Sequence, residues 1–165
     1  MGKIKILDAI RRQTRLALPS DDTYLYRIGV ALYGFNSINS FMIEIICHID
    51  GSQNQTKLHN LESGKVLDAF RQVLKNIKSS KLFPSIYKKM KEIADIFEGL
   101  NTERSDFVHT YPITNSLNEQ ILHRRQDGKG KYFEVDNNFL DSFIKRLHDV
   151  SSGLYEIRAI VKPNL

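Results

Sequence analysis

The sequence predicts an all-α domain, built as an antiparallel four-helix bundle with a short basic N-terminal arm and a β-hairpin inserted before the last helix. Three observations indicate this fold. Apolar residues recur at spacings of three and four along most of the chain, the polar links between these stretches are short, and one segment alternates instead. The 165 residues suit a single domain, 1–165, in which residues 1–18 form the arm and residues 116–136 the hairpin insertion.

The first long helix is predicted between the start signal PSDD at 19–22 and a stop at Gly51. Its apolar stripe comprises Leu25, Ile28, Leu32, Phe35, Ile38, Met42, Ile45 and Ile49. After a polar loop over 51–60, a shorter stripe predicts a second helix that packs antiparallel to the first. That stripe comprises Val66, Phe70, Val73 and Ile77.

A third helix is predicted from Pro84, a residue that suits the first turn of a helix. Its stripe runs through Ile86, Met90, Ile93, Phe97 and Leu100, and should next meet positions 104, 107 or 108, and 111. The helical register is lost after Pro112, and the segments EQILHRR and KYFEVD predict a hairpin with its turn at Asp127–Gly130.

The last helix is predicted to begin after Asp136, whose side chain can cap it, and to end at Lys162 and Pro163. Its apolar residues repeat at almost strict three-four spacing, which favours packing along its whole length. They are Leu140, Phe143, Leu147, Val150, Leu154, Ile157 and Val161.

Composition limits the classes of function. Lysine and arginine total 24 against 19 acidic residues, and the net charge of +5 favours an anionic partner, although an ordinary soluble surface explains it equally well. Cys47 is the only cysteine and has no internal disulfide partner, so we expect a reducing compartment, the cytoplasm. No apolar run reaches the roughly 18 residues of a membrane-spanning helix, so we expect no membrane association.

No metal or cofactor is expected from the motifs. Cys47, His48 and His59 lack the paired spacing of a tetrahedral metal site. Neither GxxxxGK[ST] nor GxGxxG occurs, so the chain has no phosphate-binding loop of the nucleotide-binding kind.

Arg104 interrupts the stripe of the third helix at a position where a leucine would be ordinary. Because a fully buried, unpaired charge is too costly, its guanidinium must face an acid, a cleft or an interface. One interpretation is an ion pair with Glu44 or another acid, or a long side chain that reaches solvent at a helix end. His109, five positions later in the last turn, has the ordinary role of a partner for the negative helix end.

Taken together, Arg104 and His109 favour a sharper hypothesis. A permanently charged bidentate phosphate ligand and a side chain that titrates near neutral pH suit metal-free phosphodiester transesterification. Positions five apart differ by about 140° on a regular helix. Convergence therefore requires the arginine's length, a loosened last turn or a second chain, and a symmetric dimer provides the last of these.

The segment RSDFVHTY, residues 104–111, resembles the Rx4-6H signature of the HEPN superfamily. These are small all-α domains, many of them metal-independent ribonucleases that dimerise to join two motifs into one site. The order of helices is also similar over about residues 20–160. The form RxxxxHxY resembles the HEPN toxins encoded beside a minimal nucleotidyltransferase antitoxin, in which the tyrosine, here Tyr111, is the modified residue.

This resemblance implies that an RNA 2′-OH attacks the adjacent phosphate, with His109 moving the proton and Arg104 neutralising the developing charge. Ser105 stands where the family commonly has Asn, Asp or His, and the implied supporting roles fall to Ser105, Asp106 and Tyr111. The implied partners are RNA, a second copy of the chain and a nucleotidyltransferase-type antitoxin or another regulatory protein, in toxin-antitoxin or phage defence. The alternative is a non-catalytic interaction or scaffolding module, in which Arg104 forms an ion pair at a dimer interface.

Three basic clusters are candidates for a track that follows the RNA backbone, although each such cluster is more often a solvated face than a groove. The residues favoured for nucleic-acid binding are Arg11 and Arg12 in the arm and Arg124 and Arg125 in the hairpin. The clusters also include Lys3, Lys5, Arg15, Lys75, Lys78, Lys81, Lys88, Lys89 and His123. Tyr132 and Phe133, the aromatics that adjoin these basic groups in a strand, are assigned to core packing.

Overall fold

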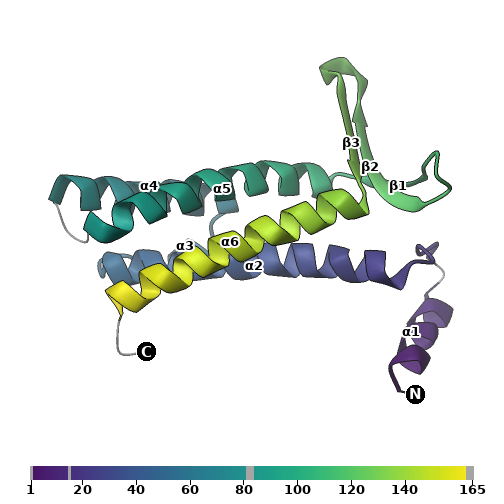
Figure 1. Cartoon of the computed structure of the whole chain (residues 1–165), viewed down its shortest axis with the longest axis horizontal. Coiled ribbons are helices and arrows are strands. Elements are labelled where there is room, and N and C mark those ends of the chain that lie inside the picture. The colour runs from purple at the N-terminus through teal and green to yellow at the C-terminus, as the bar shows by residue number, and fades with distance from the viewer. Residues whose placement is uncertain (1, 15, 81–83, 163–165) are drawn as a thin grey trace.

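The computed structural model describes residues 2–14, 16–80 and 84–162. Arg15 and Lys81 of the basic clusters and Pro163 at the predicted helix end lie outside these residues, as do the side chains of Lys3 and Lys5. The described chain is mainly helical, with a small antiparallel sheet between the last two helices (Figure 1). The helices are α1 Gly2–Gln13, α2 Asp22–Ile49, α3 Gln55–His59, α4 Ser63–Ser80, α5 Pro84–Val108 and α6 Asn137–Val161.

The mainly helical class and the four long helices are confirmed, but the second of these helices does not run antiparallel to the first. Contacts between α2 and α6 keep a constant sequence offset, from Arg27 with Asp141 to Glu44 with Arg158, so these helices are parallel. The helix α5 runs against both α4 and α6, and therefore α2, α4 and α6 share one direction (Figure 1).

The reason for this direction lies in the connection over residues 50–62, which is not the simple polar loop predicted. It contains α3, whose N-terminus is capped by the Asn54 side chain, which accepts a hydrogen bond from the backbone N–H of Lys57 at 2.9 Å. Leu58 of α3 is buried in the core, so the connection packs along α2. The chain thereby returns toward the start of α2 before α4 begins.

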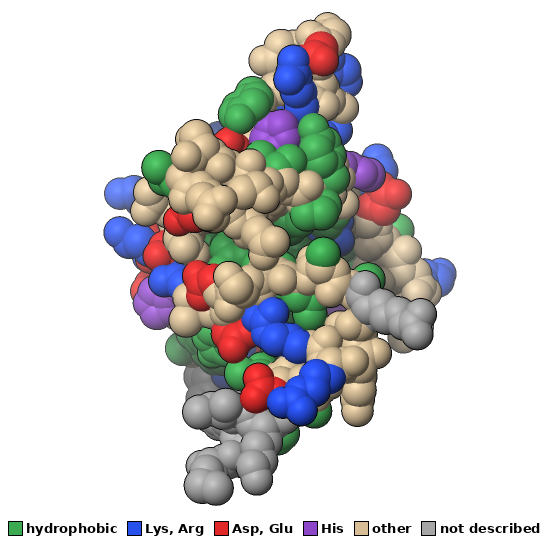
Figure 2. Space-filling view, turned by 90° about the vertical axis from the view of Figure 1, so that its right-hand side faces the viewer, with side chains coloured by type: hydrophobic (Ala, Val, Ile, Leu, Met, Phe, Trp, Pro, Cys, Tyr) green, Lys and Arg blue, Asp and Glu red, His purple; other side chains and the backbone are tan. Residues whose placement is uncertain are grey.

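The inserted segment is a three-stranded antiparallel sheet and not a hairpin alone. Its strands are β1 Tyr111–Thr114, β2 Gln120–Gln126 and β3 Lys131–Val135, in the order β1-β2-β3. The predicted hairpin is its β2-β3 half, which turns through a 3-10 segment at Asp127–Lys129 and a left-handed Gly130, and it projects beyond the bundle (Figures 1 and 2). Sequence patterns missed β1.

The helix α5 ends at Val108, so the prediction that its stripe continues to position 111 is wrong. Pro112 has no backbone N–H and disfavours helical geometry at Tyr111, which therefore opens β1. Tyr111 then pairs with His123 of β2 in the register of the sheet.

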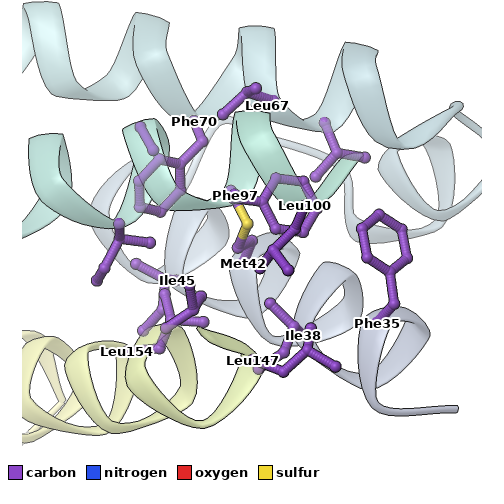
Figure 3. Close-up of a cluster of buried hydrophobic side chains, with 14 of the residues drawn as sticks. Phe35, Ile38, Met42, Ile45, Leu67, Phe70, Phe97, Leu100, Leu147 and Leu154 are labelled. Carbon is purple, nitrogen blue, oxygen red and sulfur yellow. The ribbon is translucent and has the colours of Figure 1, made fainter. Parts of the chain in front are cut away.

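The core is formed by the facing stripes of the four long helices. Phe35 of α2 stacks on Phe97 of α5 at a ring-centroid distance of 5.2 Å, and it also packs against Phe143 of α6. Figure 3 shows this apolar cluster, to which α4 contributes Leu67 and Phe70.

Tyr24 attaches the sheet to the bundle. Its hydroxyl donates a hydrogen bond to the carbonyl oxygen of Val135 and accepts one from the backbone N–H of Leu122, both at 2.8 Å. Leu122 and Val135 face each other across β2 and β3, so the hydroxyl bridges the two strands. The side chain is 3% exposed, and burial raises the pKa of the hydroxyl above its ordinary value.

By length and composition, α2 is apolar enough to cross a membrane, and it is the one such helix in the described part of the chain. This differs from the expectation that no stretch would be long and apolar enough. Eight of its side chains, from Tyr24 to Ile46, are buried in the bundle core. The apolar character of α2 therefore matches its position among the other helices.

Candidate functional site

Arg104 lies one turn before the end of α5 and is half-buried, at the edge of the aromatic core. Its guanidinium carbon is 5.6 Å from the centroid of the Phe35 ring, a cation–π contact. The aliphatic part of the side chain is thus accommodated on the packing stripe, while the charged end remains at the border of the core. This agrees with the predicted position on the stripe.

No carboxylate pairs with Arg104 within the described residues. The predicted partner Glu44 pairs instead with His48 and Arg158, whose side-chain nitrogens lie 3.3 and 3.5 Å from its carboxylate oxygen. Glu103, the residue before Arg104, forms a two-pronged ion pair with Arg146 of α6, with distances of 2.9 and 2.5 Å. The ion-pair interpretation of Arg104 is therefore not realised within one chain.

Asp106 is also committed elsewhere. Its carboxylate pairs with Arg124 of β2 at 2.5 Å and with Lys131 of β3, and its side chain is only 13% exposed. It therefore joins the end of α5 to the sheet, and in the described structure it forms no side-chain hydrogen bond or ion pair with His109. Ser105 is exposed, and no side-chain hydrogen bond of Ser105 occurs in the described structure.

His109 is exposed and lies just beyond α5. Its backbone N–H donates to the carbonyl oxygen of Asp106 at 3.2 Å, and the hydroxyl of Thr110 donates to the carbonyl oxygen of Phe107 at 2.7 Å. These i to i−3 bonds tighten the last turn, where a loosened turn would have helped convergence. Across the described residues, the side chains of Arg104 and His109 form no hydrogen bond with each other.

Tyr111 does not occupy the packing face of α5, contrary to the prediction. It stands on β1, 46% exposed, and its hydroxyl lies 3.3 Å from Nδ1 of His123. Only Thr110 separates it from His109 in the sequence, so it remains next to the candidate site.

The basic residues predicted to bind nucleic acid differ in their availability. Arg124 is held by Asp106, and Arg11 pairs with Asp22. Arg125 is exposed and pairs with Asp127 at 2.6 Å, and this hydrogen bond raises the pKa of the guanidinium further. Arg12 is exposed on α1.

Two residues in the sheet have environments that the sequence patterns did not indicate. His123, grouped with the solvated basic cluster, is 4% exposed, and its Nε2 is buried without a hydrogen-bond partner in the described structure. Tyr132, assigned to the core, is instead 66% exposed, and its hydroxyl donates to Glu134 at 2.8 Å, which raises the pKa of the tyrosine. Alternation along β2 and β3 places Tyr132 and His123 on the same face, so their different exposure comes from the neighbours, with Tyr111 and Tyr132 packed on either side of the histidine.

No protein-family model matches the chain, and no significant match was found among curated proteins or solved structures. Residues 2–14, 16–80 and 84–162 contain no group of three or more His, Cys, Asp and Glu side chains arranged as metal ligands. The geometry around Arg104 and His109 therefore has to support a functional proposal by itself.

Proposed function

We propose that this protein is a metal-independent endoribonuclease of the HEPN type, which acts as a homodimer through Arg104 and His109. The observation that carries the proposal is the unpaired guanidinium of Arg104. The two acids nearest to it in sequence, Glu103 and Asp106, both have cationic partners of their own. An arginine with no carboxylate partner among the described residues, on a chain with net charge +5, suits an anionic ligand such as a phosphate.

The chemistry requires no group beyond the chain and its substrate. A histidine removes the proton of the RNA 2′-OH, the 2′ oxygen bonds to phosphorus, and the bond from phosphorus to the 5′ oxygen breaks. A second histidine returns a proton to the leaving 5′ oxygen, which leaves a cyclic phosphate and a 5′-OH. Arg104 stabilises the negative charge that develops on the phosphate oxygens.

A dimer completes this scheme. His109 is exposed and Arg104 is half-buried, and no hydrogen bond joins them in the described chain, so a second copy is proposed to supply the other histidine. A two-fold axis near the end of α5 places His109 opposite the partner's His109, and one histidine acts as base while the other acts as acid. A nucleotidyltransferase-type antitoxin that modifies exposed Tyr111 is the regulatory partner consistent with the motif, in a cytoplasmic toxin-antitoxin or phage-defence setting.

The test is cleavage of total RNA by purified protein, with and without a chelator. Removal of one transition-state charge donor or of a general acid–base is worth about 10²–10³-fold or 10²–10⁴-fold respectively, so Arg104→Ala and His109→Ala should each lower the rate by at least about 100-fold. Arg71→Ala and His59→Ala are matched controls, because Arg71 lies on α4 in a pair with Glu98 and His59 is exposed on α3. Absence of cleavage by the wild type, or equal cleavage by all variants, contradicts the nuclease proposal.

A second candidate function is a non-catalytic interaction module, and the contact of Arg104 with Phe35 favours it. In that case the side chain serves packing, and its long apolar stem matters more than its charge. Arg104→Met separates the two proposals, since it keeps an unbranched apolar side chain over Phe35 and removes the guanidinium. An interaction module retains its stability and its oligomeric state in this variant, whereas a nuclease retains its fold and loses cleavage.

A further inference from the structure

The outer face of the sheet carries three aromatic rings in a row, one from each strand. His123 of β2 lies between Tyr111 of β1 and Tyr132 of β3, with ring-centroid distances of 5.4 and 4.5 Å and edge-to-face geometry on both sides. The histidine is buried, whereas the tyrosines are 46% and 66% exposed. The sheet therefore offers two large rings to solvent, and neither is needed to fill the core.

Both tyrosines are held in place before any ligand arrives. The hydroxyl of Tyr111 contacts His123 at 3.3 Å, and that of Tyr132 donates to Glu134 at 2.8 Å. Each ring also packs against the same histidine. Because little side-chain freedom remains to be lost, a ligand that stacks on these rings binds with a smaller entropic penalty.

One exposed cation, Arg125, stands beside the rings on this face. Arg125 stands opposite Tyr132 in the strand register, with its side chain 60% exposed. Arg124 and Lys131 belong to the opposite face, where both pair with Asp106. The guanidinium of Arg125 pairs only with the exposed carboxylate of Asp127, at 2.6 Å, among the described residues, so a phosphate can share or replace that surface pair. Figure 2 shows Lys and Arg side chains on the projecting hairpin, above a surface with histidine and hydrophobic groups.

We propose that Tyr111 and Tyr132 form a stacking platform for the bases of single-stranded RNA, with Arg125 contacting its phosphates. Tyrosines and an arginine on neighbouring strands are the groups that stack unpaired bases and bind the backbone beside them. A duplex hides the faces of its bases, so the platform selects single strands. The inference rests on the proposed function. Tyr111 lies two positions after His109, so an RNA strand whose base stacks on Tyr111 leads toward the proposed cleavage site at His109.

The test measures binding of a fluorescein-labelled oligouridylate by fluorescence anisotropy, in a His109→Ala background that prevents cleavage. Tyr132→Leu keeps an apolar side chain and removes the ring, and it should weaken binding by about 5- to 150-fold, the equivalent of one lost base stack. Tyr132→Phe keeps the ring and should bind like the parent. Tyr33→Leu is the matched control, since Tyr33 is 80% exposed on α2.

Two further measurements separate stacking from charge and from protein contact. Arg125→Ala should make the slope of log affinity against log salt concentration less steep, by the amount that about one phosphate contact contributes. Tyr132→Leu should leave that slope unchanged. The duplex of the same oligouridylate with oligoadenylate should bind more weakly than the single strand. Circular dichroism and size-exclusion chromatography confirm that each variant folds and keeps its oligomeric state.

Several results overturn the platform: no binding of oligouridylate by the parent, equal binding by Tyr132→Leu, or equal binding of the duplex. A change of oligomeric state in Tyr132→Leu at unchanged RNA affinity assigns the rings to a protein interface instead. The proposed nuclease is judged separately. If the wild type cleaves RNA and Tyr132→Leu cleaves it equally well, the nuclease proposal stands and the platform proposal fails. If binding depends on the ring but the wild type does not cleave RNA, the platform proposal stands and the nuclease proposal fails.

Discussion

Replacement of Tyr24 by phenylalanine tests how the sheet is attached to the helices. The ring remains buried in this variant, because phenylalanine has the same shape without the hydroxyl. Two hydrogen bonds of 2.8 Å disappear, one to the carbonyl oxygen of Val135 and one from the backbone N–H of Leu122. Val135 is fully buried and Leu122 is half-buried, so water replaces these bonds poorly.

The expected magnitude follows from the groups left without partners. When a buried donor or acceptor is left without its hydrogen-bond partner, the folded state loses about 1–3 kcal/mol of stability. With one group fully buried and the other partly so, the free energy of unfolding of Tyr24→Phe should fall by about 2 kcal/mol. For a chain of this length, that corresponds to a decrease in Tm of about 4–8 °C.

The assay is urea and thermal unfolding followed by far-ultraviolet circular dichroism. Tyr26→Phe is the matched control, because Tyr26 lies two residues away on the same helix and is 75% exposed. Its stability should equal that of the wild type. If Tyr24→Phe is as stable as Tyr26→Phe, the hydroxyl bridge does not hold the sheet and the reasoning fails.

The same residue predicts a dependence of stability on alkaline pH. Burial raises the pKa of Tyr24, so the folded state favours the neutral hydroxyl while the unfolded chain ionises at its ordinary pKa of about 10. The resulting stability is fully present below about pH 10 and is lost as pH rises from there toward the folded-state pKa. Wild type should therefore lose more stability than Tyr24→Phe between neutral pH and pH values above about 10.

Three further predictions concern packing and charge, each measured by urea unfolding. Gly153→Ala places a Cβ 2.9 Å from a side-chain atom of Ile93 and should lower the free energy of unfolding by about 1–2 kcal/mol. Gly99→Ala, whose Cβ meets open space, should raise it by up to about 1 kcal/mol. Equal effects of the two changes refute the close packing of α5 on α6. Asp106→Asn should lower the free energy of unfolding by about 2 kcal/mol, less than the loss of a fully buried pair, and an unchanged urea midpoint refutes the anchoring role of Asp106. The guanidinium of Arg71, hydrogen-bonded to Glu98, lowers the pKa of that carboxyl. The stability that this ion pair contributes is present above about pH 4 and is lost as pH falls through the folded-state pKa. In Glu98→Gln the free energy of unfolding should therefore fall less steeply at acid pH than in the wild type.

Local patterns in the sequence determined the long helices and the hairpin. The spacing of apolar residues reports which face of a helix is buried, and this needs no knowledge of the neighbouring elements. The cap at Asp136 is equally local, since its side chain accepts a hydrogen bond from the backbone N–H of Phe139 at 2.7 Å. The position of Arg104 on the packing stripe of α5 was predictable for the same reason.

Only the tertiary structure decided how these elements are joined. The shared direction of α2 and α4 depends on α3, whose single buried residue Leu58 is too short a signal to be read as a helix. The strand β1 exists because β2 pairs with it, and four residues beside a proline carry no pattern of their own.

Tertiary contacts also decided which charged groups are available. In the sequence, either Arg104 or Arg124 could pair with Asp106. No local pattern shows that Asp106 pairs with Arg124, while Arg104 remains without an acid in the described chain. The exposure of Tyr132 and the burial of His123 likewise depend on their neighbours, because both lie on one face of the sheet and the rings of Tyr111 and Tyr132 pack on either side of the histidine. Ion pairs and exposure depend on residues far apart in sequence. The sequence alone therefore determined the long helices and the hairpin, and the packing of the chain decided which side chains can meet a ligand.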